Sequence, residues 1–219
     1  MKKIIIIFIV AVLCMSCWAQ ENSDSKWSAI IDLGIDFPNM VYKPDFDGKL
    51  MPNIETSGAG LNLGANLISK KTNIFVPLST SFDVVVSDDL ASNGDNTAGF
   101  RWDLSAGLGY AFIHSEKVVL ALSGVMALDF NFFVWNEQYY TGSYTCTIDS
   151  VVFSLGANLY GALRLSDSVG LFAGIRMQSA LGGSGTMKLE RGHYSVSENI
   201  DVKKSPVSFI PRVGMAIFL

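Results

Sequence analysis

Four charged residues lie within segments in which apolar and polar residues alternate one by one. They are Asp32, Asp83, Arg176 and Arg212, and each occupies the polar side of its segment. Alternation of this kind is typical of a strand with one apolar and one polar face. The four residues fall at similar heights along their segments. Two acids and two bases are therefore expected to neutralise each other in a confined interior, because an unpaired buried charge is costly. The polar neighbours expected around them are Asn62, Asn158 and Gln178.

A second charged group, Arg101, Asp103 and Asp129, is expected near the outer mouth of the same interior. Two interpretations of the charged groups stay open. They form either a structural salt-bridge plug or a gate for small solutes, since charged rings set the selectivity of pores. Small residues on the polar faces leave space that bulky side chains do not obviously fill, which keeps the gate under consideration. These residues are Gly58, Gly60, Gly64, Gly107, Gly109, Gly174, Gly214 and Ala216.

The sequence offers little support for catalysis or metal binding. His114 and His193 are the two histidines of the chain, and they are too far apart to form a metal-ligand motif, so both are expected at the surface. The stretch 182–185 lacks the spacing of a nucleophile elbow. The stretch 45–48 begins like a calcium loop but lacks the downstream ligands. We therefore predict no enzyme activity, no metal and no cofactor.

The elements that would position these residues are strands, because strict alternation recurs along the chain and helical periodicity is nearly absent. The predicted strands are Trp27–Phe37, Ser57–Ile68, Ile74–Val86, Phe100–His114, Val118 to about Trp135, Val151–Leu165, Val169–Leu181 and Val207–Leu219. These eight runs predict an all-β fold, an eight-stranded antiparallel up-and-down transmembrane β-barrel.

The connections between the runs alternate between short and long. Ser69–Thr72, Ser115–Lys117 and Ser166–Ser168 are short and polar. The segments predicted as long loops are Pro38–Thr56, Ser87–Ala98, Asn136–Asp149 and Gly182–Ser205. Tight turns at one end and long loops at the other are typical of outer-membrane barrels, with both termini on the periplasmic side.

The composition of the two faces favours a membrane barrel over a soluble one. Lysines fall at strand ends, turns and loops, while the polar faces carry Gly, Ser, Asn, Asp and Arg, as a narrow interior requires. Aromatic residues lie towards the strand ends of the apolar faces, which is typical of the girdles at membrane interfaces. They are Trp27, Phe37, Phe100, Trp102, Tyr110, Phe112, Phe130 and Phe132. A soluble exported barrel that binds a small ligand remains an alternative.

Two prolines, Pro77 and Pro211, fall inside predicted strands. Each removes one ladder hydrogen bond, and a closed barrel has no edge to hold it. We therefore expect a β-bulge or a weakened ladder at one or both sites.

The N-terminus resembles a secretory signal peptide. Lys2 and Lys3 precede an apolar stretch from Ile4 to Leu13, and cleavage is expected between Ala19 and Gln20. This predicts a leader over residues 1–19 and a barrel domain over residues 20–219. Without the two leader lysines the charge is 14 minus 20, or −6, which disfavours nucleic acid as a partner. Cys146 is then the one cysteine left, so an internal disulfide is excluded.

The last strand carries the pattern Arg212-x-Gly214-x-x-Ile217-x-Leu219. This pattern resembles the C-terminal signal of outer-membrane barrels, although those favour a final Phe. With the strand pattern, the mature chain resembles the small outer-membrane barrels of the OmpW, OmpX and OmpA-transmembrane types. The resemblance implies a bacterial outer-membrane location, contact with membrane lipid, recognition by the barrel-assembly machinery and a monomer.

Two functions follow from that resemblance. The first is a structural or surface-interaction role, in which exposed loops contact an extracellular partner, as resemblance to OmpX implies. The second is a narrow pore for small solutes, as resemblance to OmpW implies for hydrophobic molecules. The sequence does not identify the solute or the partner.

Overall fold

The computed structural model describes residues 26–46, 49–50, 53–87, 97–139 and 142–219. Strands make up almost all of this part of the chain, in one antiparallel sheet. No helix within the described residues is both long and apolar enough to cross a membrane. The predicted leader lies outside the described residues.

The strands follow the alternating segments closely. They are β1 (Trp27–Asp36), β2 (Asn39–Phe46), β3 (Lys49–Leu50), β4 (Ile54–Ser69), β5 (Ile74–Ser87), β6 (Thr97–His114), β7 (Val118–Tyr139), β8 (Gly142–Arg164), β9 (Val169–Arg191), β10 (Tyr194–Lys203) and β11 (Ser208–Phe218). Every pairing between them is antiparallel, mostly between strands that follow each other in the chain. The all-β, up-and-down part of the prediction is confirmed.

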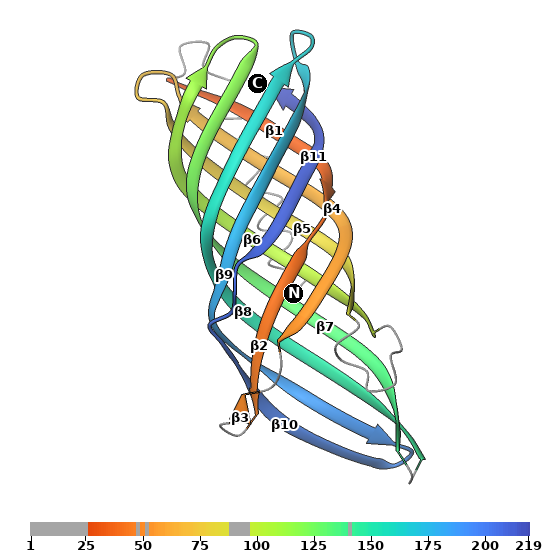
Figure 1. Cartoon of the computed structure of the whole chain (residues 1–219). Helices are drawn as coiled ribbons and strands as arrows, with labels where there is room; N and C mark the ends of the chain where they lie inside the picture. The colour runs from red at the N-terminus through yellow and green to blue at the C-terminus, as the bar shows by residue number, and fades with distance from the viewer. Residues whose placement is uncertain (1–25, 47–48, 51–52, 88–96, 140–141) are drawn as a thin grey trace.

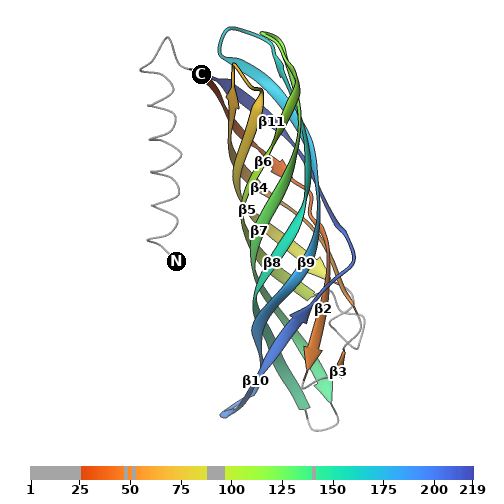
Figure 2. The same cartoon turned by 90° about the vertical axis from the view of Figure 1, so that its left-hand side faces the viewer.

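Eight strands form a continuous circuit of hydrogen-bonded neighbours, which we call the ring. Its order is β1, β4, β5, β6, β7, β8, β9 and β11, and β11 pairs with β1. Each ring strand thus has a neighbour on both sides, which satisfies backbone N–H and C=O groups without solvent. Figures 1 and 2 show the strands tilted around a common axis.

The prediction of eight strands is wrong as a count. The sheet contains eleven strands, of which β3 has only two residues. The additional strands continue the ring: β2 replaces β1 beside β4, and β10 replaces β11 beside β9. β2 and β10 also pair with each other, through residues 43–45 and 201–203. Pro38 and Pro206 lie in the interruptions, where a residue without an N–H group cannot extend a ladder.

The two ends of the ring differ in their connections. Short turns join β4 to β5, β6 to β7 and β8 to β9, as predicted; we call this the turn end, and it also holds the C-terminus (Figure 1). The long loops predicted over 38–56, 136–149 and 182–205 are wrong in large part, because the chain there is mostly strand. We call the end of the ring opposite the turn end the hairpin end. The remaining predicted loop is Ser87–Ala98, and most of it, residues 88–96, lies outside the described residues.

Neither proline produces a bulge, but the ladder weakens at both. The β5–β6 pairing keeps one register and skips Val76 and Pro77. β11 pairs first with β1 and then with β2 in the same register. Between these two pairings the ladder skips Pro211 and Ile210. The register shifts that do occur lie elsewhere, between Ala111 and Ile113 and between Phe153 and Ser154.

The side chains of the ring alternate between a buried interior and an exposed outer face. Two apolar clusters occupy the interior. The cluster at the turn end is Ile30, Ile68, Phe75, Ala111, Val119, Ala121, Tyr160, Ala162, Phe172, Ala216 and Phe218. The cluster towards the hairpin end is Met40, Tyr42, Ile54, Val85, Phe133, Trp135, Cys146, Ile148, Val152, Ala180, Ile200, Val202 and Ile210. The predicted polar residues lie between them.

Substitution of an interior glycine tests how tightly the ring is filled. A methyl group added at Gly214 would lie 2.8 Å from a ring atom of Phe172 and closer still to the carbonyl oxygen of Leu33. We expect Gly214→Ala to lower the free energy of unfolding by about 1–3 kcal/mol, the usual cost of overpacking. Urea unfolding in lipid vesicles measures it.

The matched control is Gly124→Ala, because a methyl group there meets only the Leu108 carbonyl oxygen at 4.0 Å. Equal urea midpoints for the two variants would show that the interior near Phe172 can expand.

Candidate functional site

Arg101 on β6 is the centre of a buried ion-pair network. Its guanidinium pairs with Asp83 on β5, with Asp129 on β7 at 2.6 Å and with Asp103 at 3.2 Å. Asp103 in turn accepts an ion pair from Arg176 on β9 at 2.8 Å. All five residues are buried. We call them the Arg101 network.

Uncharged side chains complete the network. Gln178 donates a hydrogen bond to Asp129 at 3.0 Å, and Ser154 donates another to the same carboxylate oxygen at 3.1 Å. These donors come from β9 and β8, so the network links strands from β5 to β9 across the interior. Buried charges tolerate desolvation only when they are paired and hydrogen-bonded in this way.

A second polar group lies closer to the turn end. Asp32 on β1 accepts hydrogen bonds from Tyr160 at 2.9 Å and from Asn66 at 2.5 Å. Arg212 on β11 donates to Asn158 at 2.6 Å and to Ser79 at 3.2 Å.

The structure therefore groups the charged residues differently from the sequence prediction. Asp83 and Arg176 belong to the Arg101 network, together with the three residues assigned to the mouth. Asp32 and Arg212 lie in the second polar group. Among the described residues, Arg212 makes no ion pair, so its expected pairing with Asp32 or Asp83 is not seen. The reason is the register of two strand pairs. The β5–β6 register places Asp83 directly opposite Arg101, and the β1–β11 register places Arg212 opposite Asp36, with Asp32 opposite Ala216.

Asp36 is an interior residue that the prediction left out of both groups. It is fully buried and lies opposite Arg212 in the β1–β11 ladder. Neither of its carboxylate oxygens has a hydrogen-bond partner among the described residues. Its position on the polar side of the first alternating run was the signal that could have identified it.

The interior between these groups is filled. The ring of Phe172 lies over both Gly34 and Gly214, and Pro77 lies against Gly107. The space that the glycines seemed to leave is thus occupied by side chains from other strands. An interior cavity has a volume of about 10 Å³, and its lining includes Asp32 and Arg212. This volume has room for about one water. The charged residues have an apolar cluster on each side.

The outer face of the ring is apolar. Large side chains are exposed on every side of it: Leu33 is 58% exposed, Leu61 68% and Leu108 67%. A monomeric soluble protein rarely exposes apolar patches of this extent. Towards the hairpin end the rings of Phe82, Trp102 and Phe130 stack, with centroids 5.8 and 4.9 Å apart.

The polarity of the two faces reverses where β8, β9 and β10 extend beyond the ring. The projecting sheet consists of Gly142–Asp149 of β8, Gly185–Arg191 of β9 and Tyr194–Ile200 of β10. Its outer face is polar: Thr145, Thr147, Asp149, Lys188, Glu190, Ser195, Ser197 and Asn199. Its inner face is largely apolar, and part of it, with Cys146 and Ile148, belongs to the apolar cluster at the hairpin end.

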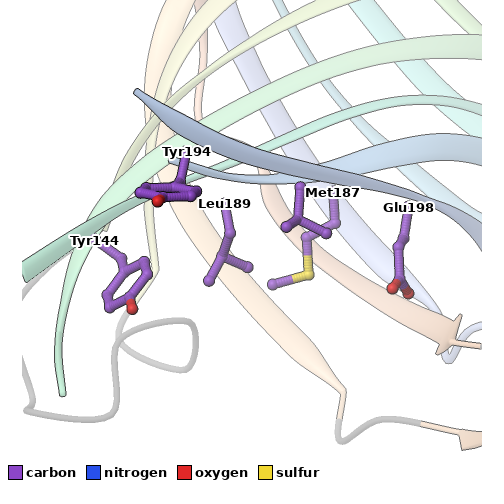
Figure 3. A pocket seen from close by; sticks show the side chains of 6 residues that line it. Tyr144, Met187, Leu189, Tyr194 and Glu198 are labelled. Atoms are coloured by element: carbon purple, nitrogen blue, oxygen red, sulfur yellow. The ribbon is translucent and has the colours of Figure 1, made fainter. Parts of the chain in front are cut away.

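A pocket of about 280 Å³ lies on that inner face (Figure 3). It is lined by Tyr144, Met187, Leu189, Tyr194, Val196 and Glu198. Tyr194 is 81% exposed and Val196 61% exposed. The sequence carried a signal for this sheet, because Tyr144-Thr-Cys-Thr-Ile148 and Tyr194-Ser-Val196 alternate, but their many polar residues favoured loops.

The C-terminal strand lies between β9 and β1 in the ring. Ile217 and Leu219 are exposed on the outer face, while Phe218 is buried inside. The Leu219 N–H donates to the Ala29 carbonyl at 2.9 Å, so pairing continues to the last residue. Gly214 is the position where the Phe172 ring approaches the backbone.

The remaining predicted candidates show no catalytic arrangement in the described residues. His114 is partly exposed, with its Nε2 3.2 Å from the Ser28 hydroxyl. His193 is exposed at the turn between β9 and β10. No group of three or more His, Cys, Asp or Glu residues in this part of the chain is placed to hold a metal ion.

Removing the centre of the Arg101 network is predicted to destabilise the protein strongly. Arg101→Met leaves Asp83 and Asp129 without their cationic partner and Asp103 with Arg176 alone, which we expect to lower the free energy of unfolding by about 3–5 kcal/mol. Lys188→Met is the matched control, because its ion pair with Glu190 is exposed and should contribute at most about 1 kcal/mol. Urea unfolding of both variants in vesicles measures the difference. A loss no larger for Arg101→Met than for Lys188→Met would contradict the assigned role of the network.

Comparison with known proteins gives structural neighbours only. No protein-family model matches the sequence, and no curated protein does. A major outer membrane protein from Thermus thermophilus aligns with a TM-score of 0.64 and 16% identity, over 89% of this chain and 100% of that one. The outer membrane protein OprG from Pseudomonas aeruginosa aligns with a TM-score of 0.56 and 11% identity, over 88% of this chain and 95% of that one. At these identities the likeness shows a shared fold: this chain has the fold of outer-membrane β-barrel proteins.

Proposed function

We propose that this protein is an integral barrel of the bacterial outer membrane, whose projecting sheet serves as a contact surface outside the cell. In this proposal residues 1–19 are a cleaved signal peptide and the ring is a closed transmembrane barrel. The C-terminal strand, with Ile217 and Leu219 on its outer face, is the segment that the barrel-assembly machinery recognises.

The observation that carries the proposal is the reversal of polarity along β8 and β9. Within the ring the outer face is apolar and the interior holds charged residues, as lipid outside requires. In the projecting sheet the outer face is polar and the inner face apolar, as water outside requires. One continuous pair of strands thus fits two different solvents, and in this proposal the change between them lies at the membrane boundary.

The projecting sheet is proposed as the contact surface because it keeps apolar area open to water. Tyr194 and Val196 are exposed beside the pocket of Figure 3, and exposed apolar pockets rimmed by polar residues mark interaction sites. Within the described residues, Tyr194–Ile200 of β10 pairs with β9 on one side only. The free side can accept a further strand.

A narrow pore has less support. Two apolar clusters lie on either side of the buried ion pairs, and an eight-stranded circuit leaves an interior only just wide enough for side chains. We therefore favour a structural role for the charged residues over a role in a pore, and a structural role does not require the barrel to conduct solutes.

The membrane position is tested by labelling intact cells with a membrane-impermeant maleimide. Ser197→Cys, on the polar outer face of the projecting sheet, should label at once. Asp167→Cys, in the turn between β8 and β9, should label only after the outer membrane is made permeable. Wild type measures any background from buried Cys146.

Heat should also change the gel mobility of the detergent-extracted protein, as closed barrels usually show. Protein in the soluble fraction, with no mobility change and equal labelling of both cysteines, would overturn the proposal.

Planar-bilayer recordings separate the two roles. We expect no openings above background from refolded wild type, because the interior is filled. Stable single-channel openings that disappear after heat unfolding would establish the pore instead.

A further inference from the structure

A groove on the outer face of the ring, near the hairpin end, is distinct from the pocket of the projecting sheet. Its volume is about 620 Å³, which lies within the usual range of small-molecule sites. Its apolar lining comes from four neighbouring strands: Phe82, Phe100, Trp102, Phe130, Phe132 and Val151. We call it the aromatic groove.

Trp102 forms the floor of the groove. It is only 5% exposed, while Phe82, Phe100 and Phe132 beside it are each more than a third exposed. The stack with Phe82 is nearly parallel, at an angle of 5° between ring planes. The indole N–H donates to the Thr80 hydroxyl at 2.9 Å, and that hydroxyl donates to the Asp103 carbonyl at 2.8 Å. The indole is thus held in place between the rings of Phe82 and Phe130. The aromatic surface open to a hydrocarbon chain is that of Phe82, Phe100 and Phe132.

The other end of the groove is polar and negatively charged. Asp149 and Thr186 face each other there on β8 and β9, at the first outward positions above Val151. Asp149 is exposed, and none of the described residues pairs with its carboxylate. Lys188, farther along β9, pairs with Glu190. The groove therefore ends beside one uncompensated carboxylate.

We propose that the aromatic groove binds a single-chain amphiphile with a cationic amine headgroup. The hydrocarbon chain lies on the exposed rings of Phe82, Phe100 and Phe132, within a few ångströms of the buried Trp102, where it is removed from water. The headgroup lies beside Asp149, where an N–H group donates a charge-assisted hydrogen bond to the carboxylate. An anionic headgroup of the same chain length is disfavoured by repulsion from Asp149.

This inference goes beyond the proposed surface role, because the groove and the projecting pocket share no residue. It can also be measured on refolded protein without any surface partner.

Quenching of Trp102 fluorescence provides the test. Refolded protein in phosphatidylcholine nanodiscs is titrated with a dibrominated C18 amine and, separately, with the dibrominated C18 carboxylic acid. We expect saturable quenching by the amine, with half-saturation at a concentration at least fivefold below that of the acid. Trp102→Phe should remove the saturable component, which assigns the signal.

Two variants locate the headgroup and the chain. Asp149→Asn should bring the two half-saturation concentrations to within twofold, whereas Asp167→Asn, an exposed acid in a turn at the other end, should leave the preference unchanged. Ser184→Phe places a ring in the groove from an exposed position on β9 and should abolish saturable quenching by both probes, with unchanged heat-dependent mobility.

Three results would overturn the proposal. They are quenching that rises linearly with both probes, an unchanged amine preference in Asp149→Asn, and saturable quenching that persists in Ser184→Phe.

Discussion

The closed circuit of strand pairing is the constraint on which the rest of the structure depends. Once every ring strand is hydrogen-bonded on both sides, side chains can point only inward or outward. The outward positions of this chain are apolar, so the inward ones hold nearly all the polar groups of the ring. Arg101 is the clearest consequence: it is fully buried, and the carboxylates of Asp83 and Asp129 from the two neighbouring strands, with Asp103 from its own strand, converge on it.

In the interior, glycines on one strand lie next to large side chains from another strand. Glycines on one strand lie against rings or carboxylates from another, as Gly34 and Gly214 lie against Phe172, and Gly60 lies against Asp83. A glycine-rich interior therefore need not be a hollow one. The charged residues of the Arg101 network sit between two apolar clusters and are paired with one another there, as the proposed structural role requires.

In the projecting sheet, β8 and β9 have the opposite polarity from the one they have in the ring. β8 and β9 cross the level of Asp149 without a break, yet their apolar side changes from outside to inside. A register shift between Phe153 and Ser154 lies just before this change. An extra residue on one strand reverses which side chains face outward beyond it. The extra residue is Leu181 of β9, so beyond it the polar residues of β9 face outward. β8 has no extra residue there, and its outer face becomes polar because Asp149, Thr147 and Thr145 continue the same alternate positions as Val151.

Much of this protein could be predicted from its alternation alone. The ring strands, their short turns and the outward face of Leu33, Leu61 and Leu108 follow from residue type, because a period of two leaves only one way to bury polar groups. The sequence did not determine which charges meet, since Asp83 pairs with Arg101 through a register that β5 and β6 set together. Nor did it determine that Phe172 fills the space over Gly214, or that strands replace the predicted loops beyond residue 136. Those outcomes depend on contacts between segments far apart in the chain, and only the tertiary structure brings such segments together.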